Sequence, residues 1–306
     1  MPIAKTDVIW INGSFIPWDD AKVNIMTHAL HYGSSWFEGI RVYNTKKGPA
    51  VFRLKPHLKR LINSAKMFRA VSPYGPEELE KATLETIKRN KMQECYIRPL
   101  IYRGYGDIGV NPLNNPVDVM ISVFVWGAYL GKDALEKGAD VCVSSWRRAA
   151  PDTFPTMAKA SGNYLNSSLI KMEAIMNGYV EGIALDSFGL VSEGSGENLF
   201  LVYEGKLYTT PFASAILPGI TRATVVQLAK DLGYEVVETM IPREWLYIAD
   251  EVFFTGTAAE ITPIRSVDKI AVGEGKPGPI TLSLHNAFQD VVRNANDKYG
   301  WLTYIS

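Results

Sequence analysis

The chain has 306 residues, which exceeds one average domain and allows two separate cores, so two domains are expected. Hydrophobic residues make up 47% of the chain and charged residues 21%, as in soluble globular proteins. Basic and acidic residues balance at 32 each, which argues against a partner that is a nucleic acid or a membrane surface.

The N-terminal residues lack a basic segment followed by an apolar run, and no stretch is long and apolar enough to span a bilayer. The sequence therefore predicts a cytoplasmic protein. Its two cysteines, Cys95 and Cys142, lie in separate strand-like runs and share no spacing pattern with histidine. We expect both to be reduced thiols in the core.

The first third of the chain has the pattern of an open sheet with two helices. An Asn12-Gly13 turn joins residues 8–11 to residues 15–16 as a β-hairpin. An aromatic and glycine-rich passage at 27–43 runs into a strand. Further strands are expected at 51–53, 96–102 and 117–125, and helices at 56–69 and 77–91. This first domain is predicted to be α+β.

The strand pattern ends near Trp126, and a new one begins at Ala139. We predict a small α+β domain at 1–125, a connector at 126–137 and a large cofactor-binding domain at 138–306. The second domain alternates strands with helices. Its strands are expected at 139–144, 182–185, 198–202, 206–208, 235–237 and 251–254, and its helices at 162–177, 220–232 and 279–297.

Two motifs suggest sites that their surroundings argue against. Residues 104–109 fit the dinucleotide fingerprint, but two prolines and three asparagines follow where that motif needs a helix, so a loop is expected. His28 and His31 are three residues apart, as metal ligands can be, yet neither a carboxylate nor a cysteine lies nearby at ligand spacing. We expect both histidines to serve packing and hydrogen bonding.

Lys159 stands among small and apolar residues, just before the helix that is expected to begin near Gly162. The positive end of a helix and apolar burial both disfavour a charged amine. Both effects lower the pKa of a lysine and make it a nucleophile that can form a Schiff base. The alternative is an ordinary solvated lysine.

Two other segments have the pattern of anion sites. Residues 217–222 place Gly219 and Thr221 at the start of a helix, where free N–H groups and a hydroxyl suit a phosphate. Capping of that helix by Thr221 is the alternative. The small residues at 256–259 follow a strand and can present N–H groups to a second anion. An ordinary strand-to-helix turn is the alternative there.

A reactive lysine, a phosphate site and a carboxylate site match part of what pyridoxal phosphate requires. Arg60, on the polar side of the first predicted helix, can add a cation for the phosphate, although a solvated arginine is the alternative. Glu193 is an isolated acid that can keep a pyridine nitrogen protonated, so that the ring acts as an electron sink.

Six motifs in order along nearly the whole chain resemble those of the branched-chain-amino-acid aminotransferases, which are class IV pyridoxal-phosphate enzymes. They are residues 31–41 (HYGSSWFEGIR), 96–100 (YIRPL), 158–165 (AKASGNYL), 192–200 (SEGSGENLF), 217–222 (LPGITR) and 256–264 (GTAAEITPI) with Ser266 after them. The resemblance implies a two-domain α+β or α/β protein with fold type IV, like that of D-amino-acid aminotransferase.

The resemblance also implies roles for the cofactor-binding residues. Lys159 would form the Schiff base and move the proton between substrate and cofactor carbons. Glu193 would pair with the pyridine nitrogen, Tyr164 would hydrogen-bond the phenolic oxygen and Leu217 would pack against the ring. The phosphate would lie among Arg60, Ile220, Thr221 and Thr257, and Gly219 and Gly256 would also belong to the cofactor-binding residues.

On the substrate side, the resemblance places the substrate carboxylate at Thr257 and Ala258. Arg98 and Tyr32 would form a polar edge for the distal carboxylate of glutamate. One pocket would thus accept an apolar side chain and then a charged one. Its walls would come from Tyr32, Phe37, Gly39, Trp126, Tyr129 and, in the neighbouring subunit, Val110.

The implied activity is transamination between Leu, Ile or Val and 2-oxoglutarate, in the synthesis or degradation of branched-chain amino acids. At least a homodimer is expected, and a hexamer as a trimer of dimers, with the loop after Gly104 as a lid that shapes the neighbouring active site. Alternatives within the family are a D-amino-acid or (R)-amine aminotransferase and an aminodeoxychorismate lyase. Outside it, they are a nicotinamide oxidoreductase and a non-catalytic α/β binding module.

Overall fold

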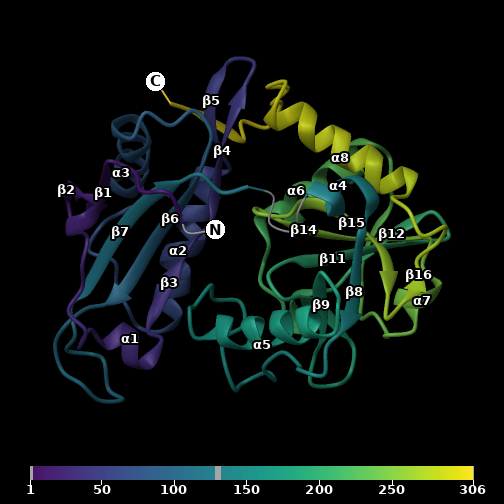
Figure 1. The fold of residues 1–306 in the computed structure, drawn as a ribbon, viewed down its shortest axis with the longest axis horizontal. Coiled ribbons are helices and arrows are strands. Elements are labelled where there is room, and N and C mark those ends of the chain that lie inside the picture. Colours follow the sequence, from purple (N-terminus) through teal and green to yellow (C-terminus); the bar gives the residue numbers. More distant parts are fainter. Residues whose placement is uncertain (1–2, 128–131, 306) are drawn as a thin grey trace. The chain divides into compact units, whose positions relative to one another are not determined.

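The computed structural model describes residues 3–127 and 132–305, and the chain divides into two compact units (Figure 1). Unit 1 comprises Met1–Trp126, Ala158–Gly162 and Asp290–Ser306, and unit 2 comprises Gly127–Met157 and Asn163–Gln289. The division at Trp126 falls where the connector at 126–137 was expected to begin, and residues 128–131 of that connector lie outside the described residues. The segments 158–162 and 290–306 belong to unit 1, whereas the sequence had placed them in the second domain.

Unit 1 is built on an eight-stranded sheet in the order β17-β5-β4-β6-β7-β1-β2, with β3 paired to β6 beside this path. Its strands are β1 (Val8–Ile11), β2 (Ser14–Pro17), β3 (Ser35–Phe37), β4 (Ile40–Thr45), β5 (Gly48–Phe52), β6 (Cys95–Arg103), β7 (Val117–Phe124) and β17 (Leu302–Tyr304). Its helices are η1 (Trp18–Asp20), α1 (His28–Tyr32), α2 (Leu54–Met67) and α3 (Pro76–Arg89).

The first hairpin forms as predicted, because Asn12 and Gly13 adopt the positive φ angles of 47° and 88° that a tight two-residue turn needs. Strand β17 was not predicted. It pairs antiparallel with β5, with Leu302 opposite Phe52, so the C-terminal segment joins the sheet beside a strand about 250 residues earlier in the chain.

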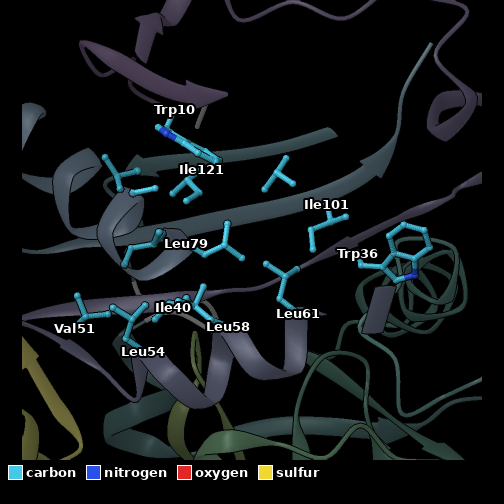
Figure 2. Packing of buried hydrophobic residues seen from close by; sticks show 14 of the residues in the cluster. Trp10, Trp36, Ile40, Val51, Leu54, Leu58, Leu61, Leu79, Ile101 and Ile121 are labelled. Carbon is cyan, nitrogen blue, oxygen red and sulfur yellow. The ribbon is translucent and has the colours of Figure 1, made fainter. Parts of the chain in front are cut away.

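The core of unit 1 lies between helix α2 and the sheet (Figure 2). Helix α2 carries Leu54, Leu58 and Leu61 at helical spacing, and all three side chains are at most 1% exposed. Figure 2 shows them pointing toward the same packed cluster as Ile40 and Ile101 of the sheet. This packing fixes which face of α2 turns toward the sheet and therefore where its polar residues lie.

Unit 2 contains a nine-stranded sheet in the order β10-β9-β8-β15-β14-β11-β12-β13, with β16 paired to β15. Its strands are β8 (Ala139–Val143), β9 (Glu181–Leu185), β10 (Val191–Gly194), β11 (Asn198–Tyr203), β12 (Lys206–Thr209), β13 (Val236–Glu238), β14 (Glu251–Gly256), β15 (Glu260–Val267) and β16 (Ile270–Ala271). Its helical segments are α4 (Lys132–Lys137), α5 (Asn163–Met176), η2 (Phe212–Ser214), α6 (Ile220–Asp231), α7 (Trp245–Ile248) and most of α8 (Pro279–Val292).

The predicted helices of the second domain are present, but the last one ends earlier than expected. Helix α8 stops at Val292 instead of continuing to 297, because Ala295 adopts a left-handed φ of 60°. The backbone N–H groups of Asn294 and Asn296 both turn back to the carbonyl oxygen of Asp290. None of the helices in the described ranges is long and apolar enough to cross a bilayer.

Replacing Leu61 with alanine is expected to lower the stability of unit 1 by about 3 kcal/mol, because the side chain is fully buried and its removal leaves a cavity. Thermal or urea unfolding measures the change. The control Lys59→Ala lies on the exposed side of the same helix and should stay close to the original stability. Equal losses in both variants would contradict the packing of α2.

Candidate active site

Lys159 is held by its backbone to two elements of unit 1. Its carbonyl oxygen accepts a hydrogen bond from the N–H of Phe37 (3.1 Å), and its own N–H donates to the hydroxyl of Ser64 (2.9 Å). Next to it, Ala160 forms an antiparallel bridge with Trp36 of β3. Helix α5 begins only at Asn163, so the backbone of Lys159 is fixed by β3 and α2 and not by the first turn of the helix that follows.

The ring of Phe37 contacts two basic side chains. The amine of Lys159 lies 4.9 Å from the ring centroid, and the guanidinium of Arg98 lies 4.7 Å from it. Arg98 also lies 5.5 Å from the ring of Tyr96, and its buried Nε has no hydrogen-bond partner among the described residues. Gly39 allows this arrangement, because a Cβ there would lie 1.6 Å from the hydroxyl of Tyr96.

Arg60 is bound by a buried carboxylate that the sequence had not marked as functional. Glu38 is fully buried and accepts two hydrogen bonds from Arg60, from Nε to Oε1 (2.6 Å) and from Nη2 to Oε2 (2.9 Å). It also accepts one from Nδ1 of the buried His57 (2.7 Å). His57, Arg60 and Ser64 are successive positions on one face of α2, which therefore holds both the carboxylate of Glu38 and the backbone of Lys159.

Burial alone would raise the pKa of Glu38, but the positive charge of Arg60 and the contact with His57 outweigh it. The pKa of Glu38 is held far below its ordinary value, so it is a carboxylate at neutral pH. Burial lowers the pKa of His57, which stays a neutral imidazole, although the carboxylate of Glu38 acts in the opposite direction. The group therefore contains one anion and one cation, Arg60.

The other residues predicted for the pocket wall each have a different set of neighbours. Tyr32 stacks on His28 at a ring distance of 4.5 Å, and Trp126 packs edge-on against Tyr96 at 4.5 Å. Val110 is 87% exposed and lies in the loop between β6 and β7. This loop contains no helix, which confirms the prediction that residues 104–109 are not a dinucleotide-binding motif. Tyr129 lies outside the described residues.

The two histidines considered as metal ligands are hydrogen-bonded to protein groups. The ring of His28 lies 2.7 Å from the hydroxyl of Ser34 and 2.8 Å from the carbonyl oxygen of Gly109. His31 lies 3.0 Å from the carbonyl oxygen of Ile25. These contacts confirm the predicted packing and hydrogen-bonding roles. Within the described ranges, no cluster of three or more His, Cys, Asp or Glu could hold a metal.

In unit 2, Glu193 is a buried residue of β10 with several fixed partners. Its Oε2 accepts hydrogen bonds from Nδ2 of Asn198 (3.0 Å) and from the N–H of Leu217 (3.1 Å). Its Oε1 lies 3.3 Å from Nε of Arg148. Arg148 also donates to the carbonyl oxygens of Gly194 and Ser195, so the turn after Glu193 is held by the same guanidinium.

The predicted phosphate segment is joined to Glu193 through Asn198. Nδ2 of Asn198 also donates to the carbonyl oxygen of Leu217 (2.9 Å), and a Cβ on Gly219 would lie 1.8 Å from Oδ1 of Asn198. Gly219 is the N-cap of α6 and has no side chain to bond the first-turn N–H groups. Thr221 lies in the first turn, so the alternative in which it caps the helix is wrong.

The third predicted site segment is the turn of a β-hairpin and not a strand-to-helix turn. Strand β14 ends at Gly256 and β15 begins at Glu260, whose φ is 52°, and the two strands pair antiparallel. Thr257 and Ala258 are half-buried residues of this turn. Tyr164 is a half-buried residue in the first turn of α5.

A second buried acid of unit 2, Glu197, differs from Glu38. Burial, followed by the charge of Glu181, raises the pKa of Glu197 to about 8. These surroundings favour the neutral acid, and its Oε2 accepts a hydrogen bond from the N–H of Gly196 (3.0 Å). It lies in the turn that follows Glu193.

Sequence reasoning missed the residues that position the predicted ones, namely Glu38, His57, Ser64, Arg148 and Asn198. A signal existed for Glu38, which is the only acid in the aromatic passage 27–43. Ser64 and Arg148, which contact Lys159 and Glu193, gave no such signal, since these contacts join segments far apart in the chain.

Comparison with known proteins places this geometry in a family. A family model described as amino-transferase class IV matches residues 35–267. The branched-chain-amino-acid aminotransferase of Escherichia coli (strain K12) is 54% identical over all of both chains. A crystal structure of the E. coli enzyme has a TM-score of 0.97 at 54% identity, covering 99% of this chain and 100% of that one. The branched-chain amino acid aminotransferase from Thermobaculum terrenum in its PLP-form (holo-form) has a TM-score of 0.92 at 34% identity, covering 99% of each chain.

Replacing Glu38 with glutamine is expected to destabilise unit 1 by on the order of 3 kcal/mol at pH 7, because the guanidinium of Arg60 then lacks its buried counter-charge. Denaturant unfolding measures the loss. The matched variant Glu85→Gln breaks an exposed pair with Arg89 and should change stability by less than about 1 kcal/mol.

The contribution of the pair between Glu38 and Arg60 to stability depends on pH, and the pKa of Glu38 gives the direction of this dependence. The folded-state pKa of Glu38 is lowered from its ordinary 4.5, so its stabilising effect is present above pH 4.5 and is lost as the pH falls below that value. The difference in stability between the wild type and the Glu38→Gln variant should therefore shrink below pH 4.5. A difference that grows on acidification would contradict the assignment.

Proposed function

The chain belongs to the class IV aminotransferase family, and we propose that it exchanges amino groups between Leu, Ile or Val and 2-oxoglutarate. It is a pyridoxal-phosphate-dependent branched-chain transaminase, and the predicted cofactor and two-domain α+β fold are confirmed. The observation that carries the substrate proposal is the ring of Phe37, with the amine of Lys159 and the guanidinium of Arg98 both against it.

The residues in both units have the donor chemistry that this cofactor needs. Glu193 is a carboxylate oriented by N–H donors, which suits a protonated ring nitrogen. Gly219, the N-cap of α6, has no side chain to cap the N–H groups of the first turn, which suits phosphate oxygens. Arg60 is fixed by Glu38 and supplies a cation for the same phosphate. We assign Tyr164 to the phenolic oxygen and Leu217 to the ring face.

Pyridoxal phosphate, when bound, supplies an electron-withdrawing ring that makes the substrate Cα–H bond acidic. The Lys159 amine is then the base that removes the proton from Cα and returns it to the cofactor carbon. The backbone bonds of Lys159 to Phe37 and Ser64 leave its side chain as the part that moves. Thr257 and Ala258 bind the substrate α-carboxylate through the turn between β14 and β15.

Arg98 lets one pocket accept two kinds of side chain. Aromatic faces surround its guanidinium, so an apolar side chain can lie against Phe37 without facing an ion pair. When glutamate binds, its distal carboxylate pairs with Arg98, whose buried Nε has no partner in the described protein. As proposed from the resemblance, the wall is completed by Tyr32, Phe37, Gly39, Trp126 and Tyr129 of the same subunit. Val110 comes from the neighbouring subunit.

The enzyme is proposed to be at least a homodimer, and a hexamer as a trimer of dimers. Helix α5 of unit 2 presents Leu165, Met172 and Met176 along one exposed stripe, with exposures of 71%, 52% and 86%. A second copy of the chain is the proposed occupant, because the formal net charge of zero puts no net repulsion between identical chains. The proposed location is the cytoplasm, where buried thiols such as Cys95 and Cys142 stay reduced.

A cofactor experiment tests the central assignment. The purified protein should be yellow, and borohydride should bleach it and leave a pyridoxyl group on Lys159 in peptide mass spectra. The Lys159→Ala variant should lose at least about 1,000-fold in rate, because both the proton transfer and the covalent attachment of the cofactor depend on the amine. A fully active variant or a label on another lysine would contradict the role.

Substrate rates test the rest of the proposal. Leucine with 2-oxoglutarate should react far faster than D-leucine, phenylalanine or (R)-phenylethylamine. The variant Arg98→Gln should slow the half-reaction with glutamate much more than that with leucine. Equal losses for both amino acids would assign Arg98 a structural role.

Sedimentation velocity tests the assembly against the subunit mass of 34.0 kDa. The wild type should sediment as a dimer or a multiple of dimers, and Met172→Glu with Met176→Glu should shift it toward the monomer, because buried unpaired charges oppose association. Val71→Glu, which adds a charge at another exposed apolar position, should leave the assembly unchanged. A monomeric wild type would rule out the proposed assembly.

A further inference from the structure

His28 connects the loop between β6 and β7 to helix α1. Its ring is 1% exposed, and Nε2 lies 2.8 Å from the carbonyl oxygen of Gly109. Its backbone N–H donates to the carbonyl oxygen of Gly104 (3.2 Å). One buried residue thus binds both the beginning and the outer part of the loop.

The base of the loop is held independently of His28. Asn115 donates to the carbonyl oxygen of Asp107 (2.9 Å), and Arg103 donates to the carbonyl oxygen of Asn115 (3.2 Å). For residues 108–114, the contact with His28 is the only hydrogen bond in the described part of the chain that leaves the loop. The position of the outer loop therefore depends on this imidazole.

The hydrogen-bond partners determine the form of the ring. A carbonyl oxygen only accepts, so Nε2 carries the hydrogen that binds Gly109. In the neutral ring, Nδ1 then accepts from the hydroxyl of Ser34 at 2.7 Å. The face of the ring stacks on Tyr32 with an interplanar angle of 25°. The imidazole of His28 thus contacts three neighbours, Gly109 and Ser34 through its two nitrogens and Tyr32 through its ring face.

We propose that His28 is a positioning residue for substrate specificity, which holds Gly109 so that the next residue, Val110, is presented to the substrate pocket of the neighbouring subunit. This inference rests on the function proposed above. Val110 is 87% exposed in the single chain and so has no packing of its own to hold it in place. The same imidazole also supports Tyr32, so it links the pocket walls of two subunits.

Two substitutions of His28 distinguish the contribution of Nδ1 from that of Nε2. Asparagine places an amide nitrogen near the position of Nδ1 and loses the bond to Gly109, whereas glutamine reaches the position of Nε2 and can keep it. In His28→Asn, the amides of 106–111 should exchange hydrogen faster, and the ratio of kcat/KM for leucine to that for glutamate should fall about 10-fold, as for one lost apolar contact. His28→Gln should stay near the wild type in loop exchange, and its substrate ratio should fall less than that of His28→Asn, because only the ring contact with Tyr32 is lost from the pocket wall.

A double-mutant cycle tests whether His28 acts through Val110. Val110→Ala lies on an exposed loop and should by itself lower the leucine to glutamate ratio about 10-fold. Adding His28→Asn should lower that ratio little further, since coupled residues are not additive. The matched control His31→Asn removes a contact with Ile25 from the same short helix and should leave loop exchange and the ratio unchanged.

Unchanged exchange in folded His28→Asn would overturn the proposal, and so would additive effects in the cycle or equal losses in His28→Asn and His28→Gln. Faster exchange with an unchanged ratio would overturn it as well. A wild type that acts on neither leucine nor glutamate would instead refute the proposed function. The exchange data of that same protein would still report the contact between His28 and Gly109.

Discussion

The buried carboxylate of Glu38 is the constraint on which the arrangement of unit 1 depends. A buried charge is tolerated only with partners, so α2 must present Arg60 and His57 at that point. The leucines of α2 meanwhile require a neighbouring face for the core. Only one rotation of α2 about its own axis places both the leucines in the core and Arg60 and His57 beside Glu38. In that rotation Ser64, one turn beyond Arg60, meets the backbone of Lys159.

The two buried acids of unit 2 have different surroundings, which favour different protonation states. Glu193 has N–H donors and Arg148 beside it, and these favour a carboxylate. For Glu197, four residues on, burial and then the charge of Glu181 raise the pKa and favour the neutral acid. The surroundings thus disfavour a second negative charge beside Glu193, and this limits repulsion where an anionic cofactor and substrate are proposed to bind.

The sequence was sufficient to predict elements whose signals are local. The Asn12-Gly13 hairpin, the amphipathic α2 and the loop after Gly104 follow from residues close together in the chain. Contacts between distant segments were not predictable: Arg148 meets Glu193, and β17 joins the first sheet, through long-range packing that no periodicity reports. The family resemblance supplied the predicted roles of Lys159 and Glu193, whereas the residues that hold them in place became visible only in the structure.

The segment 158–162 belongs to unit 1 although the residues on either side belong to unit 2. The two units are therefore not interchangeable modules in the linear sequence. A chimera of two relatives that takes residues 127–289 as one block would pair the lysine segment of one parent with the β3 and α2 of the other. Ser64, Phe37 and the segment 158–162 would have to come from the same parent. Recombination of such enzymes thus has crossover points on both sides of Lys159, five residues apart.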